Sequence, residues 1–225
     1  MSTTRFDHLV VAAESVSAGV DYLERHLGVR LPEGGEHPRM ATHNHLMQLS
    51  QSSFLEVIAT DPDAAPPARP RWFGLDDPYV RASLAASPRL LTWAVNTSSL
   101  DALELDCVPL GRSEPMSRGD LNWDITIPPD GSLAAGGLLP VALQWHADTH
   151  PAGRMQDLGC RLTGLTLYHP RADWLSTCLQ RLGAAELARV EGIGDAEGAW
   201  LEAELETPLG RRVLSSRDPH LPAGV

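Results

Sequence analysis

The sequence contains no lysine, and all 18 of its basic residues are arginines. A catalytic lysine or a Schiff base is therefore excluded. Acidic residues outnumber the basic ones, 29 to 18, for a formal net charge of −11, and the arginines form no dense run. Because a surface of this sign repels polyanions, we expect neither nucleic acid nor an anionic membrane as a partner.

Cysteine is also scarce. Cys107, Cys160 and Cys178 are widely spaced and form no C-x-x-C pair. This pattern argues against a disulfide scaffold and against a zinc-thiolate site, and it favours a reducing compartment. Long hydrophobic runs are missing, since the N-terminal run "LVVAA" is too short for a signal peptide or a membrane span. We therefore expect a cytoplasmic protein.

The hydrophobic pattern that is present, in a chain with 43% hydrophobic and 21% charged residues, predicts an ordinary globular fold. Residues 5–61 begin with a strand-like run, followed by a helical pattern with Ser15 as a plausible N-cap and Gly28 as a stop. Two or three strand-like segments follow, including "ATHNHLMQLS" and "FLEVIA". This unit is βαβββ.

The same order of patterns recurs over residues 89–147, where a short helix is expected after Ser98 or Ser99 with Cys107 on its face. A proline-rich connector, residues 62–88, carries a predicted helix from about Asp77 to Ala86. A third, less clear unit covers residues 159–216. The chain is thus predicted to contain three related units of roughly 55 residues.

Two polar residues interrupt the apolar strands of the first unit. His8 lies in "RFDHLVVAA" and Glu56 in "SFLEVIA". Alignment of the units sets His8 against Thr92 and Gly164, and it sets Glu56 against Gln144 and Arg212. A buried His–Glu pair could simply order two strands, since a buried carboxylate needs a partner. The alternative is that both residues line a functional pocket.

Several motifs together, "DHLVVAA", "THNHL", "FLEVIA", "RPRWFGLD", "TWAV" and "HPAGRMQDLGC", resemble the vicinal oxygen chelate superfamily. This superfamily includes glyoxalase I, extradiol dioxygenases and bleomycin-resistance proteins, and more narrowly the chain resembles its bacterial glyoxalase-like domain proteins. The resemblance implies an α+β fold in which paired βαβββ modules form a half-open β-sheet cup. Residues 5–150 would form this glyoxalase-like domain, units one and two would close the cup, and the third related module (159–216) would pack on the same domain. Homodimers are common in the superfamily.

The resemblance also implies roles for the two polar residues. His8 and Glu56 match the histidine and glutamate that the first unit would supply to a metal, with Glu56 as ligand or general base. An imidazole and a carboxylate suit Mn, Fe, Ni or Zn, and the substrate would carry two adjacent oxygens. The implied reaction is that of a lyase, an isomerase or a dioxygenase.

The ligand set implied by the resemblance is incomplete, because the sister units offer Thr92 with Gln144, or Gly164 with Arg212. Gln144 is a weak ligand at most. Other histidines, among them His43 and His45, could complete a site, and strand alternation places these two on one face with Asn44 on the other.

Aromatic residues are few, at 5% of the chain, yet several lie on predicted strands or in the connector near the expected mouth of the cup. Trp72, Phe73 and Trp93 are the candidates for contact with an apolar or planar ligand, although core packing is the commoner role of a tryptophan. Arg212 could place a positive charge near Glu56 or near an anionic substrate group.

Three hypotheses follow. The first is a metal-dependent enzyme that acts on a substrate with adjacent oxygens. The second is a metal-free protein that binds or sequesters a small molecule, and the incomplete ligand set favours it. The third is a domain whose pocket is vestigial.

Overall fold

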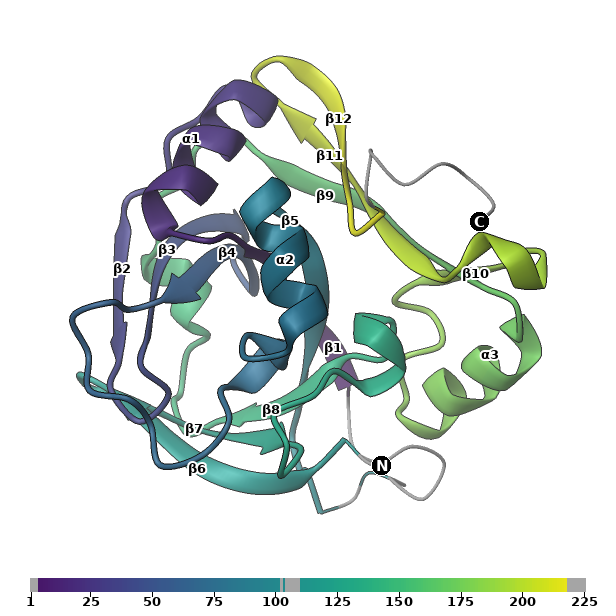
Figure 1. The fold of residues 1–225 in the computed structure, drawn as a ribbon, viewed down its shortest axis with the longest axis horizontal. Helices are drawn as coiled ribbons and strands as arrows, with labels where there is room; N and C mark the ends of the chain where they lie inside the picture. Colours follow the sequence, from purple (N-terminus) through teal and green to yellow (C-terminus); the bar gives the residue numbers. More distant parts are fainter. Residues whose placement is uncertain (1–3, 102, 104–109, 218–225) are drawn as a thin grey trace.

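The computed structural model describes residues 4–101, 103 and 110–217, which form two β-sheets and three α-helices (Figure 1). The strands of the larger sheet are β1 (Thr4–Ala12), β2 (Glu33–His37), β3 (Thr42–Ser50), β4 (Ser53–Thr60), β5 (Arg89–Thr97), β6 (Arg112–Arg118), β7 (Leu121–Ile127) and β8 (Val141–Trp145). The smaller sheet contains β9 (Arg161–His169), β10 (Arg189–Gly192), β11 (Trp200–Thr207) and β12 (Gly210–Ser215). The helices are α1 (Val16–Leu27), α2 (Pro78–Ala86) and α3 (Ala172–Arg181).

The larger sheet has the order β2-β3-β4-β1-β5-β8-β7-β6. Its two halves repeat one arrangement, since β1 runs parallel to β4 as β5 runs parallel to β8, and the halves join where β1 and β5 pair antiparallel. The predicted α+β fold with paired modules and a cup-shaped sheet is confirmed. The short helix expected after Ser99, including Cys107, lies largely outside the described residues.

Both predicted helix boundaries of the first unit are confirmed. The Ser15 hydroxyl caps α1 by accepting a hydrogen bond from the Ala18 backbone N–H. Gly28 ends the helix with a φ of 77°, a left-handed conformation that glycine adopts without steric cost. The helix lies on the convex face of the sheet, where its Leu23 and Leu27 pack in one hydrophobic core with residues of β1 and β4.

The concave face has its own core, and the connector covers it. Helix α2 begins after Asp77, whose carboxylate accepts hydrogen bonds from the first turn, as predicted. The short 3-10 helix Trp72–Gly74 and Leu84 of α2 pack against the concave-face residues of β1, β4, β5, β7 and β8. The curled sheet and the connector over its open side are visible in Figure 1.

The two edge strands of the larger sheet, β2 and β6, lie near each other across the open seam of the curl. Arg39 donates hydrogen bonds to the Pro115 carbonyl at 2.6 Å and to Glu114 at 3.1 Å. Gly35 of β2 lies against the stem of Arg118, so that a Cβ there would be 2.8 Å from Cδ of Arg118. The cup is thus narrowed by side chains that bridge its edges.

The smaller sheet packs on the convex side, where Leu201, Leu205 and Leu214 share a core with Trp93 and Val95 of β5. Its elements follow the expected order along the chain, strand, helix and three strands. In space, however, its order is β10-β9-β11-β12, whereas the corresponding order in the first unit is β2-β3-β4-β1. The physical reason is that the crossover through α3 places β10 parallel beside β9, so that β9 pairs next with β11 instead of with the last strand.

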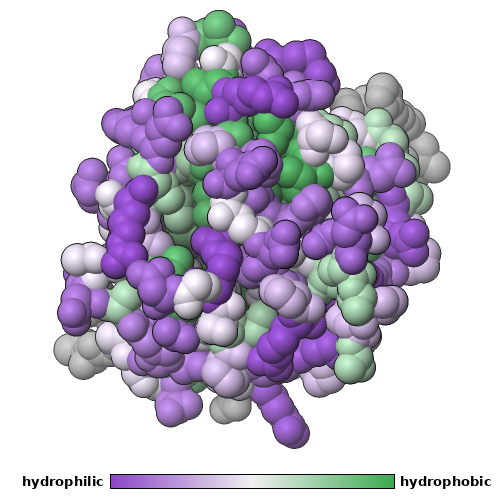
Figure 2. Space-filling model, turned by 90° about the vertical axis from the view of Figure 1, so that its left-hand side faces the viewer, coloured by the Kyte–Doolittle hydropathy of each residue, from purple (hydrophilic) through white to green (hydrophobic). Residues whose placement is uncertain are grey.

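The face of the molecule that carries β2 and α1 is mostly hydrophilic, with hydrophobic side chains gathered in its upper half (Figure 2). None of the helices among the described residues is long and apolar enough to cross a membrane.

Candidate ligand-binding site

The site begins with a β-bulge in β1. The pairing of β1 with β5 shifts between Phe6 and His8, which leaves Asp7 as the extra residue. A bulge lets two consecutive side chains act on one side of the strand, and here His8 Nδ1 lies 2.6 Å from Asp7 Oδ1. The adjacent pair Asp7–His8 thus forms one unit.

Asp7 is fully buried, with 0% of its surface exposed, and it has three donors. Besides His8, the indole N–H of Trp145 and Nε2 of His150 each lie 2.8 Å from Asp7 Oδ2. Burial raises the pKa of Asp7, but the hydrogen bonds from His150 and His8 outweigh it and hold the pKa below its usual value. The ionised carboxylate of Asp7 can only accept, so it accepts a hydrogen bond from Nδ1–H of His8, and Nε2 is the ring nitrogen left for the pocket.

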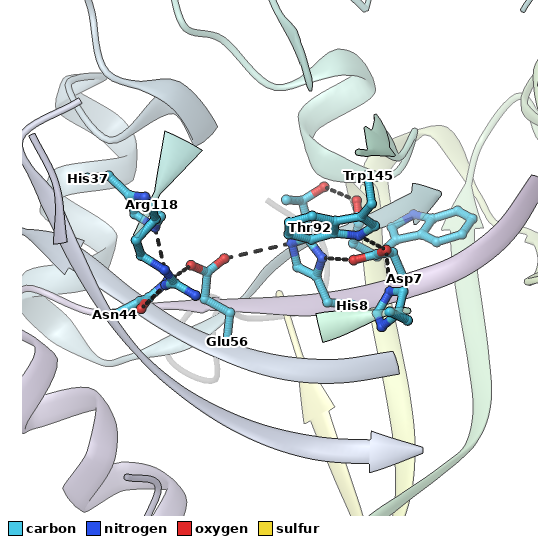
Figure 3. Close-up of polar contacts among 10 residues, drawn as sticks. Asp7, His8, His37, Asn44, Glu56, Thr92, Arg118 and Trp145 are labelled. Carbon is cyan, nitrogen blue, oxygen red and sulfur yellow. Dashed lines mark hydrogen bonds and ion pairs between the residues drawn. The ribbon is translucent and has the colours of Figure 1, made fainter. Parts of the chain in front are cut away.

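His8 Nε2 faces Glu56 of β4. Its distance to Glu56 Oε2 is 3.7 Å, which is too long for a hydrogen bond. The other oxygen, Oε1, accepts a hydrogen bond of 2.5 Å from Asn44 Nδ2. Figure 3 shows Glu56 between Asn44 and His8, so the carboxylate joins two polar groups from different strands.

Asn44 is oriented by Arg118, which reaches across the seam from β6. The guanidinium donates to Asn44 Oδ1 at 3.0 Å, and Asn44 Nδ2 also lies 3.1 Å from His37 Nε2. Burial lowers the pKa of Arg118, and the charge of Glu56 opposes this shift. Burial, together with the nearby charge of Arg118, lowers the pKa of His37 from 6.5 to about 3, so His37 is neutral at physiological pH.

These polar groups lie at the wall of a cavity of about 40 Å³, which has room for a few water molecules. The Phe54 ring stacks on His8 with their centroids 4.4 Å apart. The other hydrophobic side chains of the lining are Leu46, Trp72, Phe73, Trp123, Ile125, Leu143, Trp145 and Met155. The site is therefore a mainly apolar pocket with a few polar groups on one side, as is usual for small-molecule sites.

Comparison with known proteins identifies the family. The model of the Glyoxalase-like domain family matches residues 6–183 of this chain. The chain belongs to the glyoxalase-like domain family. This membership agrees with the resemblance of its motifs to the vicinal oxygen chelate superfamily. No curated protein matches the chain in sequence.

Solved structures are similar to this glyoxalase-like domain at low sequence identity. A hypothetical protein from Staphylococcus aureus is 12% identical with a TM-score of 0.50, and the match covers 94% of this chain and 85% of that one. Methylmalonyl-CoA epimerase from Streptomyces coelicolor is 20% identical with a TM-score of 0.38, covering 66% and 99%. The epimerase from Mycobacterium tuberculosis is 17% identical with a TM-score of 0.37, covering 62% and 85%.

Four of the residues singled out in the sequence meet in this glyoxalase-like pocket. His8, Glu56, Trp72 and Phe73 all line it. The alignment that set Glu56 against Gln144 differs from the structure, because Leu143 faces the cup, whereas Gln144 accepts a hydrogen bond from the Leu100 N–H.

The remaining candidates lie elsewhere. His43 and His45 do share a face, as alternation predicts, but it is the face of Met47 in the convex-side core, and Asn44 is the residue that enters the pocket. Trp93 is fully buried in the same convex-side core and donates to the Leu138 carbonyl. Arg212 belongs to β12 of the smaller sheet and donates to the Arg211 carbonyl.

Sequence reasoning missed several polar members of the site, namely Asp7, His37, Asn44, Arg118 and His150. The alternation in "THNHL" did separate Asn44 from its neighbours, and this was the one available signal. His37 and Arg118 lie on polar edge strands without a hydrophobic pattern, and their approach depends on the curl of the sheet.

The residues present do not fit a resident metal. His8 and Glu56 both come from the first half of the cup. In the second half, Ala94 pairs with His8 and Leu143 lines the concave face, and neither side chain can bind a metal. The Thr92 hydroxyl donates to the Gly137 carbonyl. No group of three or more His, Cys, Asp or Glu side chains in the described part of the chain could hold a metal ion. Protein metal sites normally have at least three such ligands, and the cationic Arg118 beside Glu56 further disfavours a metal.

Proposed function

We propose that the protein binds a small organic molecule in the cup without a resident metal, and that His8 and Glu56 are polar groups that contact it. One observation carries this proposal. The His8–Glu56 pair faces an apolar wall from the second half of the cup, including Ile125 and Leu143, where a metal site would need further ligands. A binding role of the sequestering type therefore has more support than metal-assisted chemistry on adjacent oxygens.

Metal analysis and thermal shifts test the proposal together. Untagged protein from metal-replete growth is expected to contain less than about a tenth of an equivalent of Mn, Fe, Ni or Zn. Aromatic compounds should raise the melting temperature, and divalent cations should not. A stoichiometric metal that is lost in both His8→Ala and Glu56→Ala would overturn the proposal, and a response to neither kind of ligand would favour a vestigial pocket.

A second function, proton transfer on the bound molecule, is supported by the Asp7–His8 unit. A buried, ionised carboxylate that holds Nδ1–H leaves Nε2 as a base of fixed orientation, the arrangement that serves general base catalysis in many enzymes. The reaction class would be isomerase or lyase chemistry that begins with the removal of a proton next to a carbonyl.

Deuterium exchange tests this second function. Carbonyl compounds that stabilise the protein would be incubated with it in D₂O, and loss of the proton signal next to the carbonyl would be followed by NMR. We expect exchange with the unmodified protein and none with His8→Gln. Equal exchange with both proteins would contradict a role of His8 as the base.

The cytoplasmic location and the homodimer remain predictions.

A further inference from the structure

Two hydrogen-bond donors in the pocket lining have no partner among the described residues. They are Nδ1 of His37 and Nε1 of Trp72, and both atoms are buried. The side chains belong to residues that are only 5% and 4% exposed. Their ring planes make an angle of 78° with centroids 5.0 Å apart, and both residues line the same cavity as His8 and Glu56.

The hydrogen-bond network fixes His37 Nδ1 as a donor. Arg118 can only donate, so the Asn44 atom that it contacts is the oxygen, and the Asn44 amide nitrogen faces Glu56 and His37. Asn44 Nδ2 therefore donates to His37 Nε2, which must be the unprotonated nitrogen of the ring. Because His37 is neutral, its proton resides on Nδ1.

Two buried N–H donors without acceptors are unfavourable, because each has lost its hydrogen bond to water. Such donors are rare in folded proteins, and a ligand acceptor is one explanation of their presence at a cavity wall. The two rings contact each other in the lining of one cavity, so a ligand oxygen atom with two lone pairs that reached both N–H groups would satisfy both donors. Trp72 and His37 thus offer the two N–H donors that a carbonyl oxygen can accept from.

The charges of the pocket distinguish a neutral oxygen from an anion. Arg118 contributes one positive charge beside Asn44, while Glu56 and the ionised Asp7 contribute two negative ones. These three charges leave one net negative charge, which would repel a ligand carboxylate. An uncharged carbonyl group accepts both hydrogen bonds and adds no charge.

We propose that the N–H groups of His37 and Trp72 form a subsite for the carbonyl oxygen of an uncharged, planar ligand whose apolar body packs against the aromatic wall. This proposal rests on the proposed function, because it requires that the cup binds a small molecule. It specifies the ligand class of that site as ketones and related neutral carbonyl compounds. A ring compound is larger than the cavity of about 40 Å³ in this structure, so lining side chains other than His37 and Trp72 would have to move when it binds.

A matched pair of probes tests the subsite. Acetophenone and α-methylstyrene have the same shape and differ in an oxygen against a methylene group. Their dissociation constants would be measured by tryptophan fluorescence and by NMR titration. We expect acetophenone to bind about tenfold more tightly, since two neutral hydrogen bonds depend on the oxygen.

Trp72→Phe removes the indole N–H and keeps an aromatic ring. This variant should lose most of the preference for acetophenone through weaker binding of acetophenone, with α-methylstyrene little affected. Trp200→Phe is the matched control, because the Trp200 indole lies in the smaller sheet and donates to Glu202. It should retain the full preference.

The outcomes separate the two proposals. If neither probe binds to the unmodified protein, the subsite for a planar ketone is overturned, while the thermal-shift response to other compounds decides the proposed function. If the two probes bind equally, or if Trp72→Phe keeps the full preference, the subsite is wrong while the binding function survives. Tighter binding of benzoate than of acetophenone would overturn the choice of an uncharged ligand.

Discussion

Because His37 is buried and neutral, we predict how the free energy of unfolding depends on pH. In the folded protein its pKa is lowered from 6.5 to about 3, because burial disfavours the cation and Arg118 adds repulsion. Between these two pH values the unfolded chain binds more protons than the folded one. The stabilisation due to the neutral ring is therefore complete above about pH 6.5 and is lost progressively as the pH falls.

The expected size follows from the ordinary pKa of an exposed histidine. At pH 5 the unfolded side chain is almost fully protonated, while the folded one is almost fully neutral. His37 should therefore lower the free energy of unfolding by about 2 kcal/mol between pH 8 and pH 5. This figure changes little if the folded pKa is one unit higher, because the unfolded chain determines it at this pH.

The assay compares urea unfolding of the unmodified protein and of His37→Gln at pH 8 and pH 5. Glutamine does not titrate, and its side-chain oxygen keeps an acceptor for Asn44. All other titrating groups are common to both proteins, so the difference between the two pH-dependent losses isolates His37. Losses that agree within about 0.5 kcal/mol would refute a buried neutral His37.

Three further substitutions test the network around the pocket. Asp7→Asn should lower the free energy of unfolding by about 3 kcal/mol at pH 7.5, since one amide cannot accept from His8, His150 and Trp145 as the carboxylate does. A decrease below about 1 kcal/mol in urea unfolding would contradict this prediction. Gly34→Ala should lower the free energy of unfolding by about 1–3 kcal/mol in the same assay, because its Cβ would lie 2.3 Å from Asn44 Oδ1. The control Gly192→Ala should leave the free energy of unfolding nearly unchanged, because the nearest atom to its Cβ would be 3.8 Å away. Arg118→Met keeps the aliphatic stem but leaves Asn44 Oδ1 without its donor, so we expect the free energy of unfolding to fall by about 1–2 kcal/mol. Unchanged stability would contradict this prediction and show that water replaces the guanidinium.

The local elements were predictable because their signals are local. Ser15 and Gly28 bound α1 since a side-chain acceptor and a left-handed residue satisfy the backbone at helix ends. The hydrophobic strands β1, β4 and β5 are buried on both faces and appear as apolar runs in the sequence. The edge strands β2 and β6 are half-solvated and polar, so no hydrophobic pattern revealed them.

The sequence by itself determined the βαβββ order of the first unit, the ends of α1 and α2, and the placement of His8 and Glu56 in one half of the cup. Only the tertiary structure decided which face of β3 enters the pocket, since alternation separates the faces of a strand without saying which is concave. It also decided the β-bulge at Asp7 and the curl that brings Arg118 from one edge of the sheet to Asn44 near the other. These features depend on the register and twist of strands far apart in the chain, and such long-range geometry leaves no local pattern in the residues that it joins.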